Sequence, residues 1–181
     1  FFPNAGLYEY YGSTEHGFYT ILKPEDQLRK VRSCGLPFFG MQIKILDENG
    51  NELPPGQIGE IYKRGLLLGA EYYKNREATE ACYRGEWASS GDMGYLDEEG
   101  YLYIVDRKKD MIISGGVNMF PSEIEEIILS HPGVKEVAVI GLPDETWGER
   151  VTAYIVPREG AALDENAIMR YCAERLSKIK V

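Results

Sequence analysis

Residues 10–15 form the first segment whose side chains suit chemistry at a phosphate group. Within six residues the segment combines two aromatic rings, a glycine, two aliphatic hydroxyls and a carboxylate. An aromatic ring such as Tyr11 can stack on a nucleobase, the Thr14 hydroxyl can donate to a phosphate oxygen, and Glu15 can ligate Mg²⁺, which takes oxygen ligands. Taken alone, the segment is more typical of a glycine turn that carries a solvated glutamate.

Two later segments also concentrate glycine, hydroxyl and charged residues. Gly59–Gly65 reads as a strand with charged residues between glycines, and we expect Glu60 to support the fold rather than to contact a ligand. Residues 87–92 end in an acid that follows a glycine turn. A carboxylate such as Asp92 can accept from both hydroxyls of a ribose, although an aspartate after glycine is also a common turn residue.

The fourth segment is the longest and the most specific. Residues 106–110 are five consecutive charged residues between two apolar runs. They are followed by Ser-Gly-Gly at 114–116, by Asn118 and by Pro-Ser-Glu-Ile-Glu at 121–125. A run of charges is usually a solvated turn, and it is also a natural place for two domains to meet.

The elements that must hold these segments differ between the two parts of the chain. Before residue 105 the apolar runs are short, and the turn-forming residues 47–51 and 97–100 each separate two runs that we expect to pair as a hairpin. Asn75 can cap a short helix that ends near Ala81. The first part is therefore predicted to be mostly β, as a small barrel or sheet subdomain.

The second part is predicted to be a compact α+β layer. Two β-branched strands, 134–140 and 151–156, lie between a helix that begins at Pro121 and a last helix capped by Asp164. Helical spacing places four residues of the first helix on one face: Ile124, Ile127, Ile128 and His131. The last helix carries Ile168, Tyr171, Cys172 and Leu176.

Composition excludes several classes of protein. The 181 residues are 44% hydrophobic and 27% charged, which is typical of a folded domain, and their net charge of -9 disfavours nucleic acid and anionic membranes as partners. Three cysteines without a Cys-x-x-Cys pair, and two histidines, predict neither a disulfide framework nor a zinc site. No apolar run approaches the roughly 20 residues that span a bilayer. We therefore expect a soluble, cytoplasmic protein and make no prediction of its oligomeric state.

Taken in order and spacing, the four segments resemble the adenylate-forming superfamily, which comprises acyl-CoA synthetases, peptide-synthetase adenylation domains and beetle luciferases. The resemblance runs from about Asn4 to Val181. The joint Asp-Arg-x-Lys-Asp, followed by Gly-Gly-x-Asn and Pro-x-Glu-Ile-Glu, looks most like the acyl-CoA synthetase branch. Ser90 stands where many members have threonine.

The resemblance implies nucleotide-site roles for six residues. Tyr11 matches the adenine-stacking position, with Gly12 beside it in the nucleotide-binding set. Thr14 matches the catalytic hydroxyl that contacts phosphate, and Glu15 matches the catalytic glutamate that ligates magnesium. The ribose is held by Asp92 and Arg107.

The resemblance also implies two roles near the charged run. Lys109 falls on the catalytic hinge position about which the small domain rotates. Gly116 matches the glycine that lines the pantetheine tunnel, and it is therefore expected to bind the cofactor coenzyme A.

The implied reaction has two steps. A carboxylate attacks the α-phosphorus of MgATP, so that pyrophosphate leaves and an acyl-adenylate forms; the thiol of coenzyme A then attacks the carbonyl and AMP leaves. The cofactors are thus ATP, Mg²⁺ and coenzyme A. The substrate is a small-molecule carboxylic acid, whether fatty, aromatic or another organic acid, and fatty acid metabolism is the expected context. Two alternatives stay open: an adenylation enzyme that loads a carrier protein, and a non-catalytic relative that binds nucleotide or a partner.

The predicted fold is α+β, in two domains joined by a hinge. Residues 1–105 are the β-rich end of a large N-terminal nucleotide-binding domain with a distorted barrel subdomain, 106–110 are the hinge, and 111–181 are a small, mobile, truncated C-terminal domain. The chain begins without methionine, and the resemblance places the phosphate loop before Phe1 and the adenylation lysine after Val181. We therefore expect a fragment that is inactive alone.

Overall fold

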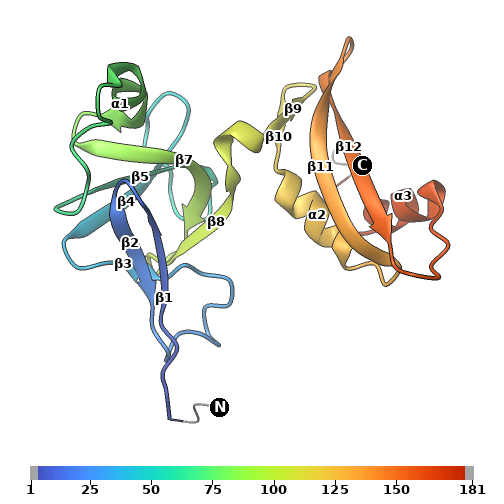
Figure 1. The fold of residues 1–181 in the computed structure, drawn as a ribbon, viewed down its shortest axis with the longest axis horizontal. Coiled ribbons are helices and arrows are strands. Elements are labelled where there is room, and N and C mark those ends of the chain that lie inside the picture. The colour runs from blue at the N-terminus through green and yellow to red at the C-terminus, as the bar shows by residue number, and fades with distance from the viewer. Residues whose placement is uncertain (1–3, 178–181) are drawn as a thin grey trace. The chain divides into compact units, whose positions relative to one another are not determined.

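The chain consists of two compact units. The computed structural model describes residues 4–177; residues 1–3 and 178–181, the outer ends of the two predicted domains, lie outside that range. Unit 1 is Phe1–Lys108 and unit 2 is Lys109–Val181, so the division falls within the charged run 106–110. Among the described residues, unit 1 contains two sheets and unit 2 contains one (Figure 1). Each unit also has its own hydrophobic core.

Unit 1 begins with a three-stranded antiparallel sheet. Its strands, in spatial order, are β1 (Glu9–Ser13), β2 (Gly17–Leu22) and β3 (Leu36–Pro37). The register of β1 against β2 shifts between Tyr11 and Gly12. Glycine is required at position 12 because a Cβ atom there would collide with the carbonyl oxygen of Gly17. The predicted glycine turn is therefore a bulged strand, and the turn itself comes later, at residues 14–16.

The second sheet of unit 1 has five strands arranged around β7. They are β4 (Met41–Leu46), β5 (Gly59–Gly65), β6 (Tyr83–Arg84), β7 (Trp87–Leu96) and β8 (Leu102–Arg107). Both predicted hairpins are confirmed, because β4 pairs antiparallel with β5 and β7 pairs antiparallel with β8. Helix α1 (Arg76–Cys82) begins at the predicted cap, where the Asn75 side chain accepts from the Ala78 amide at 3.1 Å.

The start of β8 joins the two sheets of unit 1. The Leu102 amide donates to the Gly35 carbonyl at 2.9 Å, and the Cys34 amide donates to the Leu102 carbonyl at 2.7 Å. The Leu102 side chain is fully buried and packs with Ile45 and Ile61 in the hydrophobic core. These contacts fix the first sheet against the strands that carry the later motifs.

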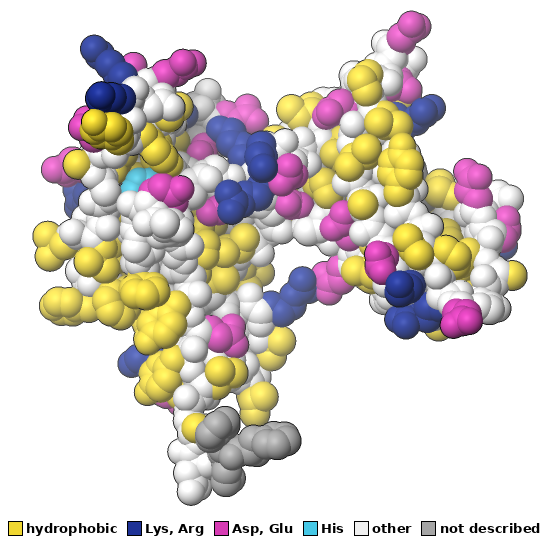
Figure 2. All heavy atoms as spheres, in the orientation of Figure 1, with side chains coloured by type: hydrophobic (Ala, Val, Ile, Leu, Met, Phe, Trp, Pro, Cys, Tyr) yellow, Lys and Arg dark blue, Asp and Glu magenta, His cyan; other side chains and the backbone are white. Residues whose placement is uncertain are grey.

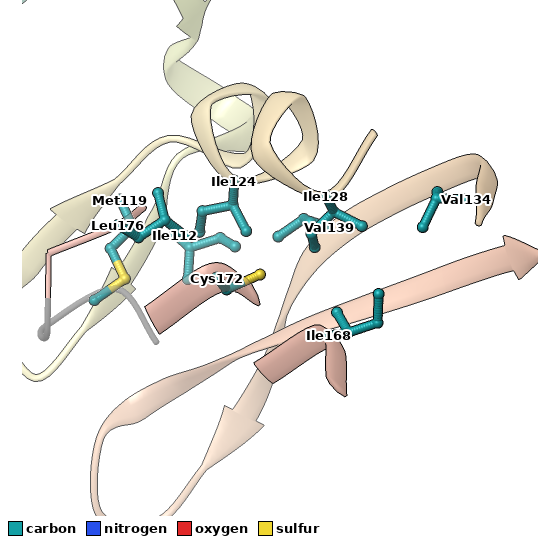
Figure 3. Packing of buried hydrophobic residues seen from close by; sticks show 9 residues of the cluster. All are labelled: Ile112, Met119, Ile124, Ile128, Val134, Val139, Ile168, Cys172 and Leu176. Atoms are coloured by element: carbon teal, nitrogen blue, oxygen red, sulfur yellow. The ribbon is translucent and has the colours of Figure 1, made fainter. Parts of the chain in front are cut away.

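The division between the units falls within the short 3₁₀ turn η1 (Lys108–Asp110), and unit 2 is an α+β layer. Its elements are β9 (Ile112–Ser114), β10 (Val117–Met119), α2 (Pro121–Leu129), β11 (Val134–Asp144), β12 (Gly148–Pro157) and α3 (Glu165–Ala173). The sheet order is β10-β9-β12-β11. Figure 3 shows the buried cluster that both helices and the sheet share: Ile112, Met119, Ile124, Ile128, Val134, Val139, Ile168, Cys172 and Leu176. The predicted α+β class is confirmed.

Strand pairing overturns two predictions in unit 1. Strand β7 already begins at Trp87, so the glycine before Asp92 lies inside a strand, where Gly91 has φ +74° and lets the strand bulge. Strand β8 continues to Arg107, so the charged run is not a simple turn. The early part of β7 pairs with β5 and β6, and the end of β8 pairs with β7, so in both cases pairing between strands extends farther than local residue preferences indicate.

The ends of the helices in unit 2 also differ from prediction. Helix α2 ends at Leu129, so His131 is not on its face; instead His131 Nδ1 accepts from the Gly133 amide at 3.1 Å. Leu176 lies beyond α3 but is still buried in the core. Within residues 4–177, no helix combines the length and the apolar character that crossing a membrane requires.

Candidate functional site

A cavity of about 680 Å³ opens in unit 1 where the β1–β2 hairpin meets β7 and β8. Its wall includes six of the eight predicted site residues, which are Tyr11, Gly12, Thr14, Glu15, Asp92 and Arg107. The remaining lining residues are Tyr10, Ser13, Gly17, Phe18, Tyr72 and Ser90. The structure therefore brings three separate motifs together at one hollow.

Asp92 is the buried carboxylate of this cavity, and both of its oxygens are engaged. Oδ2 accepts from the Tyr11 hydroxyl at 2.5 Å, and Oδ1 pairs with Arg107 Nε at 2.9 Å. The β7–β8 register places Arg107 directly opposite Asp92. A carboxylate has about four acceptor positions, so two remain for the hydroxyls of a ligand. The arrangement suits recognition of two neighbouring hydroxyls.

Tyr11 is held as a protonated donor beside this carboxylate. Burial, followed by the hydrogen bond to Asp92, raises the pKa of Tyr11. The Tyr11 ring also meets the Tyr19 ring edge-on, with the ring centroids 5.0 Å apart. The ring is thus fixed at both its edge and its hydroxyl, which defines the aromatic surface that it offers to the cavity.

Thr14 and Glu15 lie in the exposed turn after β1, at the rim of the cavity. The Glu15 backbone amide, followed by the Ser13 hydroxyl, lowers the pKa of the Glu15 carboxyl. The turn therefore presents a hydroxyl donor and an ionised carboxylate next to each other.

The donor set fits a magnesium ion that arrives with phosphate ligands, but not a protein-built metal centre. Among residues 4–177 no group of three or more His, Cys, Asp or Glu side chains is placed to hold a metal ion. Mg²⁺ is commonly bound through one or two carboxylates together with substrate phosphates and water. Glu15 can supply one such carboxylate.

The other two predicted site residues belong to unit 2. Lys109 is exposed in η1, just after the division between the units. Gly116 is exposed in the turn between β9 and β10, has φ +78°, and has open space where a Cβ atom would stand. Neither residue lines the cavity of unit 1.

Glu60 supports the fold, as the sequence predicts. Its carboxylate accepts from Ser89 Oγ at 2.6 Å and pairs with Lys108 Nζ at 2.9 Å. Burial opposes ionisation of Glu60, but Lys108 and Ser89 outweigh it and lower the pKa of this carboxyl. The pair ties the end of β8 and the beginning of η1 to strand β5.

Sequence reasoning missed a buried polar chain behind the cavity. Lys63 on β5 donates to Ser90 Oγ, whose oxygen lies 3.2 Å from the Tyr19 hydroxyl, and that hydroxyl in turn contacts Ser13 Oγ. The sequence did indicate that Lys63 is buried, because the period of two along a strand places Lys63 on the same face as the buried Ile61.

Comparisons with known proteins support the family resemblance over nearly the whole chain. The family "AMP-binding enzyme" matches residues 1–73, and "AMP-binding enzyme C-terminal domain" matches residues 123–181. A 2-succinylbenzoate–CoA ligase of Geobacillus kaustophilus is 43% identical over 176 residues, which are 97% of this chain and 36% of that protein.

Solved structures agree with these sequence matches. The o-succinylbenzoate CoA synthetase MenE of Bacillus subtilis, in complex with the acyl-adenylate OSB-AMP, has a TM-score of 0.87 at 39% identity over 96% of this chain and 36% of that chain. The same synthetase with ATP and magnesium has a TM-score of 0.85 at 39% identity, covering 97% and 36%. This chain thus spans about a third of the length of these relatives. Their named acid is 2-succinylbenzoate, so the prediction of fatty acid metabolism is not supported.

Proposed function

The chain belongs to the adenylate-forming superfamily of AMP-binding enzymes, and on that premise we propose that it is the C-terminal portion of an ATP-dependent carboxylate–CoA ligase. The observation that carries the proposal is the cavity in which Asp92, held by Tyr11 and Arg107, faces the turn of Thr14 and Glu15. Asp92 can accept from two neighbouring hydroxyls, and the turn offers a hydroxyl that can donate to phosphate and a carboxylate that can ligate Mg²⁺. These groups match the ribose and the magnesium-bound phosphates of a nucleotide.

Five residues of the cavity then have tasks in acyl-adenylate formation. Asp92 accepts from the ribose hydroxyls while Arg107 and Tyr11 hold its carboxylate, and the Tyr11 ring stacks on the adenine. Thr14 donates to a phosphate oxygen, and Glu15 ligates Mg²⁺. The metal ion, when bound, neutralises charge on the phosphates that would otherwise repel the attacking carboxylate. These residues contribute mainly by positioning and charge stabilisation.

Unit 2 is proposed to serve the second step. Lys109 is the pivot of this unit, and Gly116 lines the path of the pantetheine arm of coenzyme A. Two observations support this assignment. The chain divides into its compact units next to Lys109, and Gly116 lies in an exposed turn where a Cβ atom would have no atom within 4 Å other than those of its chain neighbours. A Lys109→Pro change restricts the backbone there and is expected to slow thioester formation far more than it weakens nucleotide binding.

A fragment of a larger protein also explains the exposed apolar surface of unit 1. Figure 2 shows hydrophobic side chains on that surface, and Leu28, Phe39 and Leu66 are each at least 90% exposed. Large exposed apolar side chains in a group are typical of surfaces that pack against further protein. Because the chain spans only 36% of the length of the related ligases, we expect the 181 residues alone not to catalyse.

The test is an assay of the full-length protein over a panel of carboxylic acids that begins with 2-succinylbenzoate. Carboxylate-dependent ATP–pyrophosphate exchange, followed by thioester formation with coenzyme A, is the expected result. Exchange without coenzyme A consumption, but with loading of a phosphopantetheinyl carrier, would favour the carrier-protein alternative. Nucleotide binding without exchange for any acid would favour the non-catalytic alternative. Exchange by the 181-residue chain alone would contradict the expected inactivity.

A further inference from the structure

Lys63 is a fully buried cation in unit 1 to which the proposed reaction assigns no role. Its side chain has no exposed surface, and its Nζ lies 4.1 Å from the centre of the Tyr19 ring. Burial lowers the pKa of Lys63 to about 8, with Asp92 opposing the shift, so the ammonium form still predominates at pH 7. A buried ammonium lowers stability unless its interactions compensate for the lost hydration. The hydrogen bonds of the Lys63 ammonium group therefore indicate why the charge is kept in the interior.

The ammonium of Lys63 forms the inner end of a chain of three hydroxyls. It donates to Ser90 Oγ; Ser90 and Tyr19 share a hydrogen bond of 3.2 Å, and Tyr19 and Ser13 share another. Tyr19 is fully buried, whereas Ser90 and Ser13 both line the cavity. The chain therefore leads from the protein interior to the cavity wall.

A count of the hydroxyl protons shows in which direction the hydrogen bonds of this chain are donated. Each hydroxyl has one proton to donate, and the two links between the three hydroxyls use two of the three protons. The third proton cannot point toward Lys63, because an ammonium group has three donors and no acceptor. Tyr19 is fully buried and its hydroxyl contacts Ser90 and Ser13, so we take its own proton to serve one of these two links. The third proton then leaves the chain from Ser90 into the cavity, or from Ser13, which also lines the cavity and acts on the Glu15 carboxylate. Without the ammonium group, the same proton could turn inward.

We propose that Lys63 is a positioning residue that orients the Ser90–Tyr19–Ser13 chain so that it presents one hydroxyl donor to the phosphate of the bound nucleotide. This inference rests on the proposed function, because that function places a nucleotide in the cavity. A chain that begins at a cation is also polarised along its length, which strengthens the last donor toward an anion. The lysine thus acts on an anionic ligand without touching it.

A comparison of AMP with adenosine distinguishes a role of Lys63 in phosphate binding from a purely structural role, because the two ligands differ only in the phosphate. Binding of each is measured by calorimetry to the full-length protein and to its Lys63→Met variant, without metal. The expected result is about tenfold weaker binding of AMP by the variant, the usual worth of a hydrogen bond to a charged group, with adenosine binding unchanged. Lys44→Met is the matched control, since Lys44 is a lysine on the adjacent strand β4 whose ammonium lies over Trp87. It should leave both affinities unchanged.

A Ser90→Ala background tests whether the lysine acts through the hydroxyl chain. In that background the Lys63→Met change should have no further effect on AMP binding. A full additional effect would mean that the ammonium acts on the ligand directly, and it would overturn the inference. Equal losses for AMP and adenosine, or no loss for either, would overturn it as well. If the unaltered protein bound neither ligand, the proposed function would fail first, and this inference with it.

Discussion

The interiors of the two units are built on different principles. The core of unit 2 is a single cluster of nine buried apolar or thiol side chains from three strands, two helices and the segment after α3. Unit 1 has a smaller apolar cluster around Ile45, Ile61 and Leu102, and it buries charged and polar side chains such as Lys63 and Asp92 beside its cavity. The interior of unit 2 is mainly apolar, whereas unit 1 also buries a polar network, which favours a defined site at a cost in stability.

The largest expected effect comes from the core of unit 2. Ile124→Ala removes a side chain of α2 that is only 4% exposed, and it should lower the free energy of unfolding by about 2–5 kcal/mol, because the helix and sheet cannot close the resulting cavity. Denaturant unfolding measures this. The matched control is Ile113→Ala on β9, which is 48% exposed and should cost less than about 1 kcal/mol. Equal effects of the two changes would contradict the assignment of the core.

In unit 1, Lys63→Met should raise the free energy of unfolding, whereas Ile124→Ala in unit 2 lowers it. The pKa of Lys63 falls from an ordinary 10.5 to about 8 on folding, so below pH 8 the folded protein carries a penalty of about 3 kcal/mol for keeping the proton. The methionine variant should therefore be more stable than the parent at pH 7 by up to about 3 kcal/mol.

The pH dependence gives a second check on Lys63. Between about pH 8 and pH 10.5 the unfolded chain binds a proton that the folded chain has released, so the stability of the parent rises with pH. The advantage of Lys63→Met should shrink over the same range in denaturation measured at several pH values. A constant difference would show that burial of the charge is not its cause. Lys44→Met, which loses a contact with Trp87, should instead destabilise by under about 1 kcal/mol.

Asp92→Asn tests the ligand side of the polar network. The change removes the charge that Tyr11 and Arg107 hold in place, and it should weaken binding of both AMP and adenosine by about thirtyfold, since each contains the ribose. Calorimetry with the full-length protein measures both affinities, and the exposed Glu98→Gln serves as control. A loss confined to AMP would place Asp92 at the phosphate rather than at the ribose.

The smallest expected effect concerns the pair between Glu60 and Lys108. Lys108→Met should lower stability by about 0.5–1 kcal/mol, because Glu60 is mostly buried whereas Lys108 is half exposed, and the difference should shrink at high salt. Arg76→Met breaks an exposed pair with Glu80 on α1 and should cost no more than about 0.5 kcal/mol. Thermal unfolding at two salt concentrations compares them. If the loss of stability caused by Lys108→Met did not depend on salt concentration, the contribution of Lys108 would not come from its ion pair with Glu60.

Local sequence patterns predicted which helices and strands form better than they predicted where these elements begin and end. The cap at Asn75, the helix beginning at Pro121 and the two hairpins of unit 1 follow from neighbouring residues, and all are present. The extension of β7 and β8 through Gly91 and Arg107 was missed, because pairing with a remote strand overrides local turn preference. The role of Gly12 was likewise hidden, since its need for glycine comes from the backbone of β2.

By itself the sequence determined the α+β class, most of the elements and the residue types that a nucleotide site requires. Only the tertiary structure decided that Tyr11 and Asp92, 81 positions apart, share a hydrogen bond, and that Lys63 ends a hydroxyl chain behind the cavity. The physical reason is that periodicity and turn chemistry depend on neighbours within a few residues. The meeting of remote side chains depends instead on strand order, register and bulges, which no single segment encodes.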